Sequence, residues 1–352
     1  MLPDVLVFSV EEDRYCWRDV VLSAVRQGEW RAVERRVREG AACVSAADQQ
    51  GTALPAAAVD AAARDFRYAE DLVTAQSMEE WLQRHDLSVQ EWTAYLRRDV
   101  LRTRHTADRR ELVGRYPISD DEATRLTMVD AKCSSRLGTW ARALAERAAA
   151  HASVVARRNG TNDPAAQRAV EPLPAQHVAP LAVLWGETRA SLLPAAQRLE
   201  RLDESQITFR AAVLTDRVVR DYVSARQLDW VRFDCRVMAF PNETMAAEAA
   251  MLLREDGEGF TSVYQVAHTE PRVGQFFLDQ IDASMRDHFL GARVGDLIGP
   301  SRIEGEFVLY QVEKKALPTV DDPDVRCRAE DGVLRAALEH QVASRVTWQS
   351  PP

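Results

Sequence analysis

The chain has 352 residues, of which 46% are hydrophobic and 28% charged, enough for one large or two to three small hydrophobic cores. The formal net charge of -9 argues against a nucleic-acid-binding protein, because such proteins usually show a basic face. Five cysteines are scattered and never form a Cys-x-x-Cys pair. The sequence therefore predicts no zinc site and no disulfide framework, and it favours a reducing compartment.

The N-terminal segment lacks the basic start of a signal peptide, and no run of about 18 apolar residues occurs that could span a bilayer. Lysine is nearly absent, which is typical of a GC-rich bacterial genome. We therefore expect a soluble bacterial protein of the cytoplasm that has no membrane partner.

Residues 1–158 show the pattern of successive helices. Three Ser-x-x-Glu segments have the spacing of helix N-terminal capping boxes. These are Ser77–Glu80, Ser88–Glu91 and Ser119–Glu122. A fourth, alanine-rich helix is expected over 135–156, and large aromatic residues are expected to fill the core. These are Trp81, Trp92 and Trp140.

Residues 159–180 contain four prolines and few large apolar side chains, so they indicate a linker or an exposed loop. Connecting helices are expected over 181–227, the last of them capped by Thr215. From there the period changes, because apolar and polar residues alternate over 231–237 as in a half-buried strand.

The remaining elements follow from turn signals and apolar runs. A helix is expected after Pro241 and a short helical piece over 260–268, followed by a loop that includes 268–277. A continuous apolar strand is expected over 306–315, and an amphipathic helix over 331–348.

Part of this stretch resembles the parvulin (PpiC or rotamase) family. The segment ARVGDLIGPSRIEGEFVLYQVEKK (292–315) is similar to the turn and closing strand of that family, with Gly295, Asp296, Gly299 and Pro300 at matching positions. Residues 246–268 resemble the helical stretch of the domain, and residues 214–230 resemble the segment that precedes it in SurA-like proteins.

The resemblance implies an α+β fold with the SurA/PrsA plan. A large all-helical N-terminal domain (1–158) would precede a parvulin-like domain (228–317) with an antiparallel sheet and flanking helices. A C-terminal helix (318–352) would pack back on the N-terminal helices.

The resemblance also implies a peptide groove. The two family histidines fall on Arg236 and Val308, and the Cys or Asp position falls near Glu270. Met285 and Phe289 match the spacing of the apolar proline pocket, although the same spacing also fits a plain core pair. The full set of groove candidates is Arg236, Met238, Glu270, Phe277, Met285, Phe289 and Val308.

Because both family histidines are replaced, we expect a peptide-binding chaperone or foldase with weak or absent prolyl isomerase activity and with no cofactor or metal. Its client would be a peptide or unfolded protein, and the resemblance to parvulin-like proteins of bacterial peptide-maturation systems implies a ribosomal precursor peptide. One alternative is an active isomerase whose polar groups were re-sited to His268, Glu270 or His288. Another is a non-catalytic interaction subunit. Cys133 and Cys235 are expected to be small buried hydrophobes.

Overall fold

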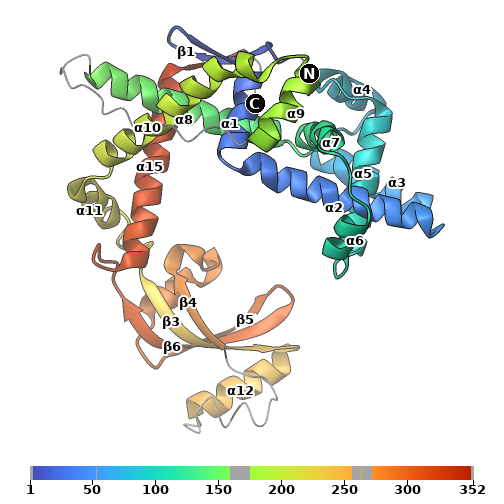
Figure 1. Cartoon of the computed structure of the whole chain (residues 1–352). Helices are drawn as coiled ribbons and strands as arrows, with labels where there is room; N and C mark the ends of the chain where they lie inside the picture. The colour runs from blue at the N-terminus through green and yellow to red at the C-terminus, as the bar shows by residue number, and fades with distance from the viewer. Residues whose placement is uncertain (1–2, 53, 159–174, 256–262, 264–271, 350–352) are drawn as a thin grey trace. The chain divides into compact units, whose positions relative to one another are not determined.

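The computed structural model describes residues 3–52, 54–158, 175–255, 263 and 272–349 (Figure 1). These residues are mostly helical and form two small antiparallel sheets, so the fold belongs to the α+β class. The chain divides into two compact units. We call them the helical unit (1–210 and 338–352) and the sheet unit (211–337).

The helical unit combines a long run of helices with a three-stranded sheet. Its strands are β1 (Leu6–Val10), β2 (Asp13–Cys16) and β7 (Val346–Trp348). Its helices are α1 (Trp17–Arg26), α2 (Glu29–Gln49), α3 (Ala56–Ala69), α4 (Ala75–Arg84), α5 (Val89–Arg104), α6 (Arg109–Arg115), α7 (Asp120–Cys133), α8 (Arg136–Arg158), α9 (Ala175–Trp185), η1 (Arg189–Leu192) and most of α10 (Leu193–Val213).

The expectation of an all-helical N-terminal domain is wrong, because β1 lies between β2 and β7 in an antiparallel sheet. Phe8 pairs with Trp348, and its ring stacks on Tyr15 with centroids 4.8 Å apart. The helix expected over 331–348 accordingly ends at Arg345. β7 has only three residues, too few to show a strand period, and its partner strand lies at the other end of the chain.

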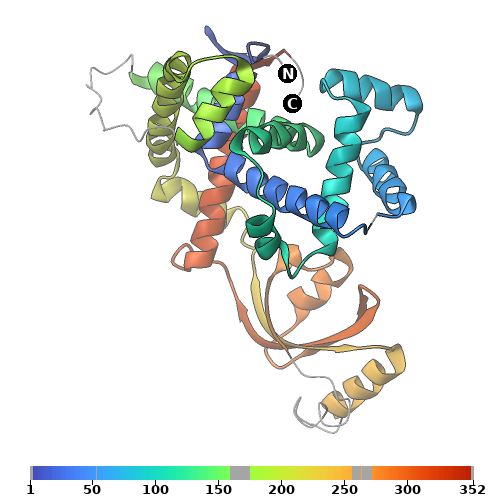
Figure 2. The same cartoon turned by 45° about the vertical axis from the view of Figure 1, so that its right-hand side comes forward.

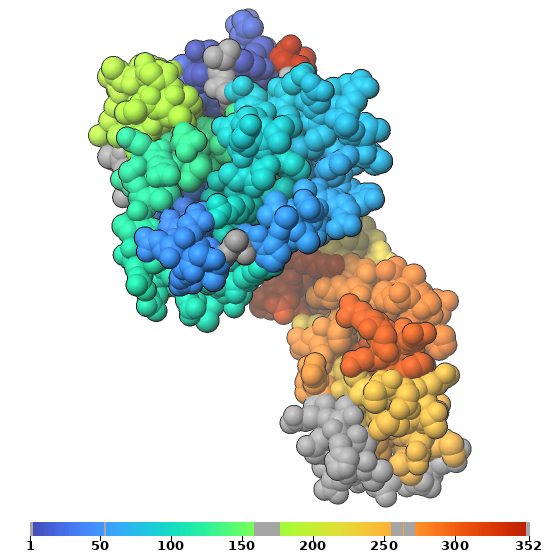
Figure 3. All heavy atoms as spheres, turned by 90° about the vertical axis from the view of Figure 1, so that its right-hand side faces the viewer, coloured from blue at the N-terminus to red at the C-terminus, as the bar shows by residue number. Residues whose placement is uncertain are grey.

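The described part of the helical unit has more than one hydrophobic core, and two of these contain tryptophans. The main core includes Trp30 and Trp140, whose ring centroids lie 6.1 Å apart. The second contains Trp81 and Trp92, which both contact Phe66 edge-on. The helices that supply most of this second core, α3, α4 and α5, lie together on one side of the unit (Figures 2 and 3). The three tryptophans named from the sequence are therefore buried as expected.

Of the three helix caps predicted from Ser-x-x-Glu segments, two are confirmed and one is wrong. Ser88 caps α5 and exchanges bonds with Glu91, as predicted. Ser119 caps α7, and its hydroxyl accepts the backbone N–H of Glu122. The box at Ser77 is wrong, because α4 starts one turn earlier with Thr74 as its cap and Ser77 as the reciprocal partner. Thr74 has the extended backbone that a cap needs.

The proposed loop over 159–180 is wrong in its last part. Residues 175–180 belong to α9, which contains Pro180, whereas 159–174 lie outside the described residues. Val178, Leu181 and Ala182 are buried in the main core. Burial of this apolar stripe outweighs the backbone hydrogen bond that a proline removes from a helix interior.

The sheet unit is built on a four-stranded antiparallel sheet in the order β4-β3-β6-β5. Its strands are β3 (Arg232–Phe240), β4 (Arg272–Phe277), β5 (Leu297–Ile303) and β6 (Glu306–Ala316). Its helices are α11 (Asp216–Ser224), α12 (Glu243–Glu255), η2 (Leu278–Gln280), η3 (Ala283–Met285), α14 (Arg286–Gly291) and most of α15 (Pro323–Arg345).

Alternation along β3 divides the sheet's two faces, as the sequence predicts. Phe233 and Cys235 face a core that also contains Met285 and Phe289 from η3 and α14. Met238 and Phe240 lie in a second core, formed with α12. Strands β4 and β5 were not anticipated: the sequence suggested a loop over 272–277 and a turn over 295–300. The short helical piece expected over 260–268 lies outside the described residues except for residue 263.

Candidate functional site

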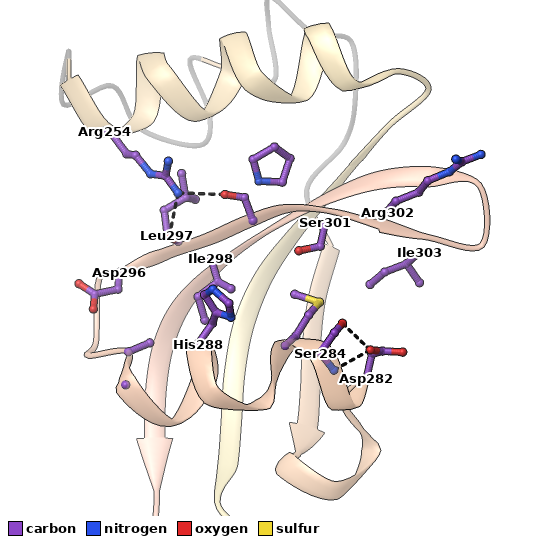
Figure 4. A pocket seen from close by; sticks show the side chains of 15 residues that line it. Arg254, Asp282, Ser284, His288, Asp296, Leu297, Ile298, Ser301, Arg302 and Ile303 are labelled. Carbon is purple, nitrogen blue, oxygen red and sulfur yellow. Dashed lines mark hydrogen bonds between the residues drawn. The ribbon is translucent and has the colours of Figure 1, made fainter.

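A pocket of about 970 Å³ lies along β5 in the sheet unit. Strand β5 ends the described sheet, because its one strand neighbour there is β6. Figure 4 shows α12 on one side of β5 and the η3–α14 segment on the other, so the pocket follows the free edge of the strand. An edge strand exposes backbone N–H and C=O groups that another chain can pair with.

The side of the pocket formed by η3 and α14 combines apolar and polar groups. Met285 is 5% exposed, and it lines the pocket together with His288, one helical turn further on. Ser284 donates from its backbone N–H (2.9 Å) and its hydroxyl (2.6 Å) to Asp282 Oδ1. These two hydrogen bonds lower the pKa of the Asp282 carboxyl, so it is ionised at neutral pH.

Hydrogen bonds from two side chains to backbone carbonyls hold η3 and α14 in position. Arg286 donates from Nε to the carbonyl of Ile281 (3.0 Å) and from Nη2 to that of Asp279 (3.0 Å). Lys315 of β6 donates from Nζ to the carbonyl of Ala292 (3.1 Å), where α14 ends. These contacts hold Met285 and His288 beside β5 in a fixed arrangement.

The turn into β5 requires glycine at two positions. Gly295 has φ +95° and donates its N–H to the carbonyl of Val312 (2.7 Å). Gly299 has φ +104°, and a Cβ there would lie 2.5 Å from the carbonyl oxygen of Val308. The glycines of the Gly-Asp and Gly-Pro pairs thus have a local physical role, because side chains are disfavoured at positive φ.

On the side of the pocket that faces α12, the lining residue is Arg254. Its Nη2 donates to the carbonyl oxygens of Gly299 (2.9 Å) and Leu297 (3.4 Å), as the dashed lines in Figure 4 show. Both carbonyls therefore face away from β6. Sequence reasoning missed Arg254 and most of the β5 lining. The Gly299-Pro300 turn, Met285 and His288 were the features of the sequence that pointed to this region.

The structure brings few of the predicted groove residues together. Among them, Met285 lines the pocket, and Phe289 lies beneath it, fully buried with edge-on contacts to Phe233 (5.2 Å) and Tyr310 (5.3 Å). Phe289 is thus a core residue of this face. Met238 is fully buried on the opposite face, against α12. Glu270 and His268 lie outside the described residues.

Arg236 and Val308, the positions where the resemblance would place histidines, also lie outside the pocket lining. Arg236 is half exposed and forms an ion pair with Glu313 (2.6 Å) on the neighbouring strand. Val308 is buried on β6, where it pairs with Ala239 and with Ser301.

Phe277 belongs to a different cluster, in which α15 packs on the sheet unit. The guanidinium of Arg328 lies over the rings of Trp230 (4.7 Å) and Phe277 (4.6 Å), and it forms an ion pair with Asp279. This contact gives Phe277 a structural role beneath the C-terminal helix.

Neither Cys133 nor Cys235 is an activated nucleophile. Burial raises the pKa of the Cys133 and Cys235 thiols to about 12, with nearby carboxylates adding to the shift. Both side chains are buried, as the sequence suggested. A thiol with so high a pKa is protonated at neutral pH and reacts slowly.

No family model matches the sequence, and a search of curated proteins finds no match. Among the helices of the described residues, none is long and apolar enough to cross a membrane. Within the same residues, no group of three or more His, Cys, Asp or Glu side chains is arranged to hold a metal ion.

Proposed function

We propose that the sheet unit is a parvulin-like peptide-binding domain and that its client binds in the pocket beside β5. The observation that carries this proposal is the combination of a free sheet edge with a pocket of about 970 Å³ that includes Met285. Extended peptides commonly add to exposed sheet edges, where backbone hydrogen bonds give affinity and neighbouring pockets select side chains. The volume lies within the usual range of about 300–1,000 Å³ for ligand pockets.

Two further features support the family part of the proposal. Strand β3, helix α12 and the closing strand β6 succeed one another in the order that the resemblance implies. The Gly295 and Gly299 turns occupy positions where the backbone needs glycine. The resemblance of the sequence to parvulin-like proteins of peptide-maturation systems makes a cytoplasmic ribosomal precursor peptide the proposed client, and a peptide holder needs no cofactor.

A chaperone without efficient isomerase activity is the favoured form of the proposal. Arg236 and Val308 stand where the family has histidines, and neither lines the pocket. The alternative is an active isomerase, and one specific observation favours it: His288 lines the pocket beside Met285. An imidazole can donate or accept a hydrogen bond, so this side chain can polarise a rotating amide that is bound beside it.

Titration of the full chain with fluorescently labelled proline-containing peptides tests the binding site. Ser301→Tyr adds an aromatic ring to the pocket, and Val273→Tyr adds the same ring to β4, the strand at the opposite edge, where Val273 is 75% exposed. We expect weaker peptide binding for Ser301→Tyr alone. Equal affinity for both variants and the wild type would place the client elsewhere.

A protease-coupled proline isomerisation assay then separates the chaperone from the enzyme. The isomerase would be favoured if the wild type accelerates isomerisation and His288→Ala abolishes the acceleration. The control His340→Ala, on the exposed surface of α15, should then retain it. Peptide binding without acceleration would favour the chaperone. Recovery of one stoichiometric protein partner, with no peptide binding, would favour the interaction subunit.

A further inference from the structure

A second pocket, of about 980 Å³, lies in the helical unit and is rich in arginine. It is bounded by the first half of α2, by α6, by the start of α7 and by His177 of α9. Four arginines line it, although the chain as a whole has a net charge of -9. These are Arg31, Arg35, Arg38 and Arg110.

Among the arginines that line this pocket, Arg38 binds partners within the protein and so stabilises the fold. It forms ion pairs with Glu34 (2.7 Å) and Asp120 (2.6 Å) and donates to the carbonyl of Ile118 (3.1 Å). Glu34 also lies 3.0 Å from His177 Nδ1. The carboxylates of Glu34 and Asp120 are thus occupied by partners within the protein.

The other three arginines have no such role. Within the described part of the chain, Arg31, Arg35 and Arg110 make no hydrogen bond or ion pair. Arg31 and Arg35 lie one turn apart on α2, where two like charges repel each other. Arg110 is on α6, which packs against α2. The remaining lining carboxylate, Glu39, is 3.7 Å from both Arg102 and Arg109.

The start of α2 adds to the positive charge of the pocket. Gly28 is the N-cap of this 21-residue helix and lines the pocket, and no side chain caps the first-turn N–H groups. The first N–H groups of a helix attract anions because they have no partner within the helix and the helix dipole is positive there. Free guanidinium groups and an uncapped helix start therefore point to the same kind of ligand.

We propose that this pocket binds a peptide segment that carries at least two acidic side chains. Guanidinium groups pair with carboxylates through two parallel hydrogen bonds. A compact polyphosphate fits less well, because it would bring several negative charges close to Asp120 and Glu39, which also line the pocket, whereas a peptide can place two separate carboxylates at the arginines. Ala32 and Val113 supply apolar contacts. This site is independent of the function proposed for the sheet unit.

Fluorescence anisotropy of the full chain with a labelled Glu-Gly repeat peptide tests the proposal. We expect saturable binding that weakens steeply with added salt, and no saturation with a matched Gln-Gly peptide. Arg35→Gln and Arg110→Gln should each weaken binding about three- to tenfold, as loss of a charged hydrogen bond implies. The matched control is Arg64→Gln, since Arg64 is exposed on α3 and outside the pocket.

Three outcomes would overturn the proposal. One is equal binding of the Glu and Gln peptides. Another is an equal loss of affinity in Arg64→Gln, which would indicate a general charge effect. The third is binding of pyrophosphate without binding of the acidic peptide. Because the substituted arginines are exposed and unpaired, their variants should retain the wild-type melting temperature, which separates loss of the site from loss of the fold.

Discussion

The guanidinium of Arg254 on α12 donates a 2.9 Å hydrogen bond to the carbonyl oxygen of Gly299 on β5. A second bond from the same nitrogen reaches Leu297 (3.4 Å). Both acceptors lie on the free edge of the sheet, where an added strand would bind. Arg254 thus occupies two backbone acceptors that would otherwise be available to another chain, one way in which proteins protect edge strands.

Replacement of Arg254 by Ala should strengthen client binding, because an incoming peptide no longer competes with the guanidinium for two carbonyls. One net hydrogen bond corresponds to about 0.5–1.5 kcal/mol, so a gain of roughly two- to tenfold is expected in a peptide titration. Arg302→Ala is the control, since Arg302 lines the same pocket without bonding to the β5 carbonyls. Weaker binding in Arg254→Ala would instead make Arg254 a ligand-binding group.

Gly299→Ala should destabilise the sheet unit more than Gly305→Ala. Both glycines have positive φ, +104° and +94°, so alanine strains either position by about 1 kcal/mol or more. A Cβ at 299 also meets the Val308 carbonyl at 2.5 Å, whereas a Cβ at 305 has open space. We expect a difference of about 1–3 kcal/mol in the free energy of unfolding by urea. Equal losses of stability in the two variants would contradict the close approach of residue 299 to the Val308 carbonyl.

Removal of the Arg328 side chain should destabilise the packing of α15 on the sheet unit. The guanidinium contacts two aromatic rings and Asp279, so Arg328→Ala leaves a partly buried carboxylate without its partner. A loss of about 2–4 kcal/mol is expected in chemical unfolding. Arg326→Ala, in which a half-exposed ion pair with Asp216 is lost, should cost less than about 1 kcal/mol. Similar losses in the two variants would contradict the packing of the Arg328 guanidinium on the two aromatic rings.

The free cysteines should differ sharply in reactivity. At pH 8 an alkylating reagent should modify exposed Cys327 first, while Cys133 and Cys235, with pKa values of about 12, stay protonated until the chain unfolds. Peptide mapping by mass spectrometry with and without urea measures this difference. Rapid labelling of Cys235 in the native protein would contradict the burial.

The raised pKa values of the same two thiols predict a loss of folding stability at alkaline pH. Their pKa is raised from 9.0 in the folded chain, so the unfolded state loses its thiol proton first. The free energy of unfolding should therefore fall as the pH rises from about 9 to about 12. The double variant Cys133→Ala/Cys235→Ala should show a shallower decline, and an unchanged slope would assign the effect to other groups.

Sequence reasoning succeeded where the signal is local. The caps at Ser88, Ser119 and Thr215 begin helices because a side-chain oxygen satisfies a nearby backbone N–H. Alternation from 231 to 237 gives β3 its two faces. Trp81, Trp92 and Trp140 are buried because their large apolar surfaces leave water.

What the sequence by itself determined is therefore most helices and strands β3 and β6, because short-range periodicity and capping specify them, whereas the α+β class was implied by the resemblance. The tertiary structure alone decided that Val346–Trp348 pairs with β1, that Met238 and Met285 lie on opposite faces of the sheet, and that Arg254 reaches the β5 edge. These relationships join residues about 45 to 340 positions apart. Strand order and the packing of the faces bring such residues together, and no local pattern records that arrangement.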